Sequence, residues 1–141
     1  MGRDLQNTAI QPSVGTATEE FSTAEIRAAL ARVLASQTIA GSERLVQFLR
    51  FVVETKVHGN ADHLKETIIG VSVFGRAPDY DPKADTIVRS QAWRLRAKLN
   101  EYYSSEGADD PLMIYMPRGC YVPVFIRRGV DATNGPFEPT H

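Results

Sequence analysis

A short stretch of the chain gathers positive charge around its single tryptophan. Between Thr86 and Asn100 there are four cations and no acidic residue. The cations are Arg89, Arg94, Arg96 and Lys98, and Trp93 lies among them. Arginine side chains bind phosphates and guanine edges, and an aromatic ring can pack on sugars or thymine methyl groups. The stretch therefore favours contact with an anionic partner, and the plainer alternative is a solvated helix face.

Other chemically capable residues do not form the pattern of a site. The segment Gly70–Ala77 approaches a phosphate-binding loop, but Arg76 and Ala77 replace the lysine and the hydroxyl residue that such a loop needs. The aspartates of residues 79–85 lack the glycine and the glutamate of a calcium loop. Two of the three histidines are separated by a glycine-containing segment, and Cys120 has no base nearby in the sequence. We expect no enzyme activity, no metal, no cofactor and no small-molecule ligand.

Two amphipathic helices are predicted before the basic stretch. The first spans residues 21–36, with Ser22 as its N-cap and Glu25 as the capping-box partner. The second spans Glu43–Val57, with Ser42 as its N-cap. The apolar stripe of the first helix must be buried, and we favour packing on the second helix over pairing with another copy of the chain.

A third, shorter helix is predicted from an N-cap at Asp62 through Ile69. The apolar, β-branched segment Gly70–Gly75 fits either a helix or a strand, and a loop follows over residues 76–85. A fourth helix runs from about Ala84 to Tyr103. At about 100° per residue, its core stripe holds Val88, Ala92, Leu95, Leu99 and Tyr102. Its other face carries Arg89, Ser90, Trp93, Arg94, Arg96, Ala97 and Asn100. This face suits a major groove, whereas coverage of Trp93 by Phe21 or another N-terminal residue would make the ring structural.

Two β-rich runs predict a hairpin near the end of the chain. The runs LMIYM (112–116) and CYVPVF (120–125) surround a three-residue loop that contains Arg118 and Gly119. Pro123 cannot donate to a ladder, so its strand should lie at an edge. Arg118 at the loop could reach phosphates or a minor groove, although a single hairpin arginine is usually an ordinary surface residue.

The basic helix and the hairpin together resemble a known family. DTIVRSQAWRLRAKL followed by LMIYMPRGCYVPVF is similar to the C-terminal effector domain of OmpR-type two-component response regulators. Those domains carry an R-L-R-x-K-L-like block and a wing ending in R-G-x-G-Y, which are matched here by Arg94–Leu99, Arg118-Gly119 and Tyr121. More broadly, residues 42–125 resemble winged-helix modules at the front of longer bacterial repeat proteins.

The resemblance implies a role for particular residues. It places Arg89, Ser90, Trp93, Arg94 and Arg96 on the groove side of a recognition helix and Arg118 at the wing. Two departures stand out, because Cys120 replaces the second wing glycine and a helix replaces the family's N-terminal sheet. No receiver domain or phosphoacceptor aspartate is evident, so control by phosphorylation is not implied.

Composition limits the remaining possibilities. With 141 residues, 43% hydrophobic and 23% charged, the chain has the make-up of a globular domain. We expect a polar arm over residues 1–20, one domain over 21–128, and a tail or linker over 129–141. A single cysteine and the absence of a long apolar run favour a soluble cytoplasmic protein that does not contact a membrane.

The sequence therefore predicts an α+β fold, a winged helix-turn-helix with an added N-terminal helix and a C-terminal hairpin wing. The expected function is sequence-specific binding of double-stranded DNA in transcription regulation, with helix 84–103 in the major groove and wing 112–125 on the backbone or minor groove. The alternative is a protein-interaction module of the same fold. The net charge of -1 and a sequence pI of about 6.3 favour that alternative.

Overall fold

The computed structural model describes residues 21–128. Its elements are α2 (Thr23–Ala35), α3 (Gln37–Ala40), α4 (Glu43–Val57), the 3₁₀ turn η1 (Ala61–His63), α5 (Glu66–Phe74), α6 (Ile87–Tyr103), β2 (Leu112–Tyr115) and β3 (Val124–Arg127). Helices with a small antiparallel sheet make the fold α+β, as the sequence predicts. The arm predicted for residues 1–20 and the tail predicted for residues 129–141 lie outside the described residues.

The first two predicted helices are confirmed with their caps. The Ser22 hydroxyl accepts a hydrogen bond from the Glu25 backbone N–H at 3.1 Å, and the Glu25 carboxylate accepts one from the Ser22 N–H at 2.8 Å. This reciprocal capping box starts α2. Ser42 caps α4 by accepting from the Leu45 N–H at 3.3 Å. The short helix α3 between them is an addition that the sequence pattern did not predict.

The prediction for the third helix is wrong in its start, and the helix continues over residues 70–74, whose state the sequence left open. Asp62 lies in η1 and caps no α-helix, and α5 begins at Glu66 after an N-cap, Lys65, that makes no side-chain bond. The helix continues through Phe74, whose ring packs edge-on against Phe48 at 5.4 Å between centroids. The helix lies further toward the C-terminus than predicted because its apolar residues pack against the core, and this tertiary packing outweighs the local cap signal at Asp62.

The loop before α6 is confirmed, and α6 begins three residues later than predicted, at Ile87. The Asp85 carboxylate accepts a hydrogen bond from the Ile87 N–H at 3.2 Å and pairs with Arg76 at 2.6 Å. The Arg76 guanidinium holds the pKa of this carboxyl below its usual range. Asp85 therefore closes the loop and starts α6 from a position just outside the helix.

The hairpin is confirmed, but its predicted three-residue loop is wrong. The antiparallel register runs from Leu112 opposite Arg127 to Tyr115 opposite Val124, so residues 116–123 form the loop. The second strand begins after Pro123, because proline has no N–H to give to the ladder.

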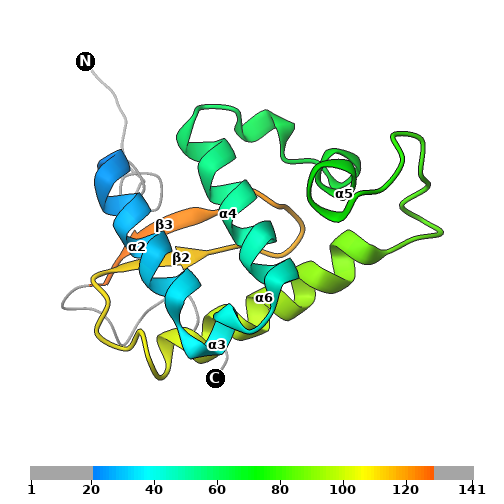
Figure 1. Ribbon diagram of the computed structural model, residues 1–141. Coiled ribbons are helices and arrows are strands. Elements are labelled where there is room, and N and C mark those ends of the chain that lie inside the picture. Colours follow the sequence, from blue (N-terminus) through cyan, green and yellow to red (C-terminus); the bar gives the residue numbers. More distant parts are fainter. Residues whose placement is uncertain (1–20, 129–141) are drawn as a thin grey trace, which may run out of the picture.

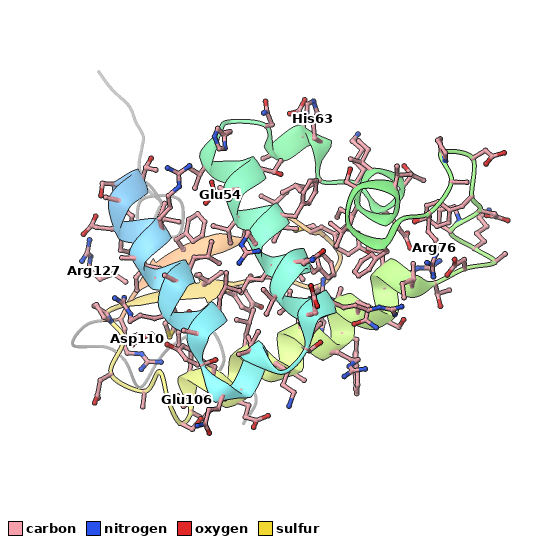
Figure 2. All side chains as sticks on the ribbon, in the orientation of Figure 1. Glu54, His63, Arg76, Glu106, Asp110 and Arg127 are labelled. Atoms are coloured by element: carbon pink, nitrogen blue, oxygen red, sulfur yellow. The ribbon has the colours of Figure 1, made fainter. Side chains whose placement is uncertain are left out.

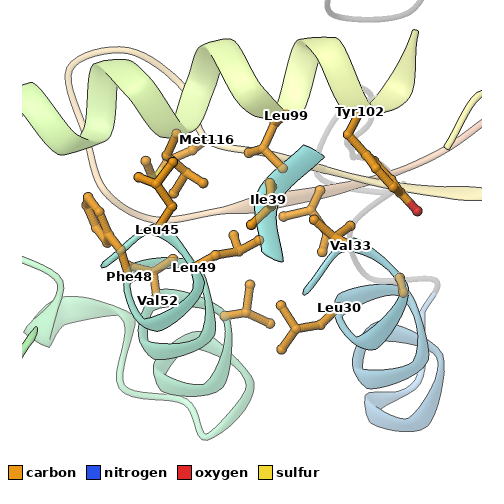
Figure 3. Packing of buried hydrophobic residues seen from close by; sticks show 14 of the residues in the cluster. Leu30, Val33, Ile39, Leu45, Phe48, Leu49, Val52, Leu99, Tyr102 and Met116 are labelled. Atoms are coloured by element: carbon orange, nitrogen blue, oxygen red, sulfur yellow. The ribbon is translucent and has the colours of Figure 1, made fainter. Parts of the chain in front are cut away.

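One hydrophobic core joins the helices to the sheet. Figure 1 shows α2 and α4 side by side over the sheet, with α6 crossing below them and α5 beside α4. Figure 3 shows labelled side chains of α2, α3, α4 and α6 facing one another in this core, with Met116 beside α6. The α2 stripe of Ile26, Ala29, Leu30 and Val33 is buried within the chain. This confirms intramolecular packing of the first helix, since no second copy is needed to cover its stripe.

Candidate nucleic-acid interface

Helix α6 has one buried face and one exposed face, as its periodicity predicts. Its buried residues are Val88, Gln91, Ala92, Leu95, Leu99, Tyr102 and Tyr103. Its exposed residues between 89 and 100 are Arg89, Ser90, Trp93, Arg94, Ala97 and Asn100. Six of the seven residues that the sequence singled out lie on α6, and five of those six are exposed.

Trp93 is the most exposed large apolar side chain among residues 21–128. It is 69% exposed, against 37% for Ile68, the next such residue in the described part of the chain. Phe21 does not cover it, because the Phe21 ring packs near the sheet with the Arg127 guanidinium 4.6 Å from its centroid. Within residues 21–128 the indole therefore has no packing role and is available for contact with a partner. The other N-terminal residues that the sequence analysis named as a possible cover lie outside the described residues.

Two exposed arginines and an exposed asparagine of this region make no hydrogen bond or ion pair to any described residue. These are Arg94 and Asn100 on α6 and Arg118 in the hairpin loop. All three are exposed, and Gly119 beside Arg118 has φ +84°, a left-handed conformation that glycine adopts without strain. The two arginines therefore offer charged groups that no other described residue neutralises.

Arg89 and Ser90 are already bonded within the fold. The Arg89 guanidinium donates to the Glu66 carboxylate at 3.0 Å and to the Pro82 carbonyl at 2.7 Å. The bond to Glu66 raises the Arg89 pKa. The Ser90 hydroxyl donates to the Thr86 carbonyl at 3.0 Å, so it turns back onto its own helix. Arg89 stays exposed, and a phosphate could replace the carboxylate of Glu66 as its partner.

Arg96 takes a different position from the one expected of it. Its guanidinium is half-buried and donates to three carbonyl oxygens of the hairpin loop. These are the carbonyls of Met116 at 3.0 Å, Pro117 at 3.0 Å and Cys120 at 3.1 Å. Burial lowers the Arg96 pKa. The helical spacing explains this position, because Arg96 lies at the edge of the core stripe and faces the loop.

Lys56 gives the hairpin loop a second anchor. Its ammonium group donates to the Pro123 carbonyl at 3.0 Å and lies 5.5 Å from the centre of the Phe125 ring. Burial lowers the Lys56 pKa. Nothing in the sequence identified this contact, since Lys56 stands in the last turn of α4, where a cation is common. The two anchors hold the loop against α4 and α6 and leave the tip around Arg118 exposed.

The positive charges around α6 and the hairpin loop are partly neutralised. Arg118 lies near enough to Arg96 for its charge to contribute to the lowered Arg96 pKa. Arg89 shares its charge with Glu66, whereas Arg94 and Arg118 keep theirs. We name the α6–loop surface as the exposed side chains of residues 89–100 together with Arg118. Within this surface, Arg94 and Arg118 are the arginines that make no ion pair to a described residue, whereas Arg96 is half-buried and bonded to the hairpin loop.

Two further observations concern residues 21–128. Their histidine, cysteine and acidic side chains form no group of three that could hold a metal ion. None of the helices in this part is both long enough and apolar enough to cross a membrane.

Comparison with known proteins gives no relative. No protein family, curated protein or solved structure matches the chain. The function must therefore be argued from the geometry of the described residues.

Proposed function

We propose that the chain is a winged helix-turn-helix domain that binds double-stranded DNA and regulates transcription. In this proposal α6 enters the major groove, and the tip of the hairpin loop meets the backbone or the adjacent minor groove. The observation that carries it is the exposed Trp93, which shares the α6–loop surface with the unneutralised charges of Arg94 and Arg118.

The order and packing of the elements support this proposal. Helix α5 packs against α6, and the hairpin follows α6 directly in the chain. A major groove about 12 Å wide admits one α-helix, and an exposed face of about three turns can reach several base pairs. The Arg96 bonds hold the hairpin loop beside α6, so that one rigid unit would carry both contacts.

Each exposed side chain then has a role that follows from its chemistry. Trp93 would pack on sugars or thymine methyl groups, and the small Ala97 would let the helix approach closely. Arg94 at the side of the face and Arg118 at the loop tip would bind phosphates. Arg89 would exchange Glu66 for a phosphate or a guanine edge, and Asn100 can pair with adenine. Arg96 would act indirectly, by positioning Arg118.

A second candidate function is protein recognition by the same surface. The exposed apolar ring of Trp93 and the neutralisation of Arg89 by Glu66 favour it. Exposed aromatic side chains are common at the centre of protein interfaces. In this alternative the partner would be an acidic protein surface.

Fluorescence anisotropy with the full chain and a labelled pool of random duplexes separates the two candidates. We expect binding that weakens with salt, and Arg94→Gln and Arg118→Gln should each reduce the slope of log affinity against log salt by about one unit. Arg50→Gln is the matched control, because Arg50 lies on the exposed face of α4 and also makes no hydrogen bond or ion pair to a described residue.

Sequence selection from the pool followed by a Trp93→Ala variant tests the groove assignment. This variant should lose more affinity on the selected site than on random duplexes. A reporter gene placed behind the selected site then tests regulation. A chain that fails to bind the pool at low salt, or arginine variants that match Arg50→Gln, would reject DNA binding in favour of protein recognition.

A further inference from the structure

A groove of about 460 Å³ lies away from the α6–loop surface. Most of its lining comes from residues 47–58, on the face of α4 opposite the core stripe, and α5 provides Ser72 and Val73. A volume of this size falls within the range of roughly 300–1,000 Å³ that is typical of small-molecule sites. The groove therefore has room for a small ligand.

The charge that faces this groove is positive. The one carboxylate in its lining, Glu54, already accepts hydrogen bonds from Arg27 at 2.8 and 3.1 Å. Figure 2 shows Glu54 on the side of α4 toward α2, the helix that carries Arg27. The contact with Arg27 lowers the Glu54 pKa, so this side chain is an anion whose charge is neutralised. Arg50, in contrast, makes no hydrogen bond or ion pair within residues 21–128.

Several polar groups of the lining are not engaged within the described fold. The hydroxyls of Thr55 and Ser72 and the side-chain amide of Asn60 make no hydrogen bond to described residues. The His58 ring donates from Nδ1 to the Glu54 carbonyl at 2.7 Å, which leaves Nε2 as its remaining polar atom. The Arg50 guanidinium only donates, and the hydroxyls and the amide beside it can donate as well, which fits a ligand group that accepts, such as a carboxylate.

The rest of the lining is apolar. Phe51 and Val73 are partly buried and pack against the hydrophobic core, so their positions are fixed by that packing. A ligand that touches them gains from burying a hydrocarbon surface. We propose that this groove binds a small organic carboxylate with an apolar body, whose carboxylate pairs with Arg50 while its hydrocarbon part lies on Phe51 and Val73.

The test uses the full chain labelled with ¹⁵N and phenylacetate as the probe. We expect saturable shifts of the backbone amide signals of residues 47–60 and 72–73, with a dissociation constant of about 1 mM or below. Phenylacetamide has the same ring without the charge, and acetate has the charge without the ring. Each should bind at least about fivefold more weakly, because each lacks one of the two contacts.

Two variants assign the binding to the groove. Arg50→Gln should weaken phenylacetate binding about tenfold, the usual effect of losing one charged hydrogen bond. Arg94→Gln, which removes an equally partnerless arginine from α6, should leave it unchanged. Arg50→Gln is also the control in the DNA-binding experiment, where it should have no effect. Failure of the carboxylate site would therefore leave the DNA-binding proposal intact, and failure of DNA binding would leave the carboxylate site intact.

Three results would overturn the carboxylate site. The first is a lack of saturation with phenylacetate at about 10 mM. The second is equal binding of phenylacetamide, and the third is shifts that map to α6 and survive in Arg50→Gln.

Discussion

Replacing Arg96 with methionine should detach the hairpin loop from α6. The substitution keeps an unbranched side chain and removes a guanidinium that bonds three loop carbonyls at 3.0–3.1 Å. A hydrogen bond to a charged group contributes about 1.5–3 kcal/mol when it is well buried. This guanidinium is only half-buried, and the released carbonyls can bind water. We therefore expect the free energy of unfolding to fall by about 2–3 kcal/mol, less than the sum of three such bonds.

Urea unfolding with linear extrapolation measures this loss. Arg94→Met is the matched control on the same helix, and its exposed, partnerless side chain predicts a change within about 0.5 kcal/mol. Hydrogen exchange provides a local measurement, because the amides of residues 116–123 should exchange faster in Arg96→Met while those of α2 change much less.

The reasoning is refuted if Arg96→Met and Arg94→Met have the same stability, or if exchange in the loop is unchanged. Arg96→Lys extends the test in case the methionine variant does not fold. Lysine keeps the charge but has a single nitrogen, which cannot match the planar fork of a guanidinium. Its stability should lie between that of the methionine variant and that of the original chain.

Three further predictions test other contacts, each by urea unfolding. Gly70→Ala should lower the free energy of unfolding by about 1–3 kcal/mol, because a Cβ at residue 70 would overlap the Tyr80 hydroxyl. In a double variant with Tyr80→Ala this overlap is absent, so the two losses should be less than additive, and strictly additive losses would contradict the account. The Glu106 carboxylate accepts hydrogen bonds from the Thr38 hydroxyl and from the first N–H groups of α3, and these bonds lower its pKa. The stability that they add to the fold is present above the pKa of Glu106 in the unfolded chain, and it is lost as the pH falls through the lower pKa of the folded state. Glu106→Gln should therefore flatten the acid side of the stability curve between about pH 6 and about pH 3, and an unchanged curve would refute this account. Tyr103→Phe should lose about 1–3 kcal/mol because the buried hydroxyl oxygen accepts from a β2 backbone N–H at 2.7 Å, and a loss under about 0.5 kcal/mol would contradict that role.

The helices that the sequence predicted correctly are those whose signals are local. The capping box of α2 joins Ser22 to Glu25, and both residues lie within one turn. Ser42 caps α4 in the same way, and an apolar stripe follows each cap. Signals of this kind depend on neighbouring residues alone, so they can be identified without knowledge of the fold.

The parts that were wrong depend on contacts between distant segments. The hairpin loop has its length because Arg96 and Lys56 hold it, and Lys56 and Pro123 are 67 residues apart in the sequence. The extension of α5 to Phe74 depends on the packing of Phe74 against Phe48. Local turn and cap propensities at Asp62 were weaker than these tertiary contacts.

The candidate interface was predicted in part for the same reason. Helical periodicity correctly placed Trp93 and Arg94 on the exposed face of α6. Periodicity does not identify bonding partners, so the bonds of Arg89 to Glu66 and of Arg96 to the loop were missed. The groove on α4 was missed as well. Its positive charge comes from Arg50, and this becomes evident only when the pairing of Glu54 with Arg27 is known.

The contact between Phe21 and Arg127 brings the two ends of the described fold together. The ring and the guanidinium lie 4.6 Å apart, at the start of α2 and the end of β3. A short peptide could therefore join residue 128 to residue 21, and new ends could be opened in the exposed loop at Ala77-Pro78. Such a circular permutant would keep every helix–helix and helix–sheet contact, since closing a short loop costs little additional entropy. The order of the elements along the chain is thus separable from the arrangement that they form in space.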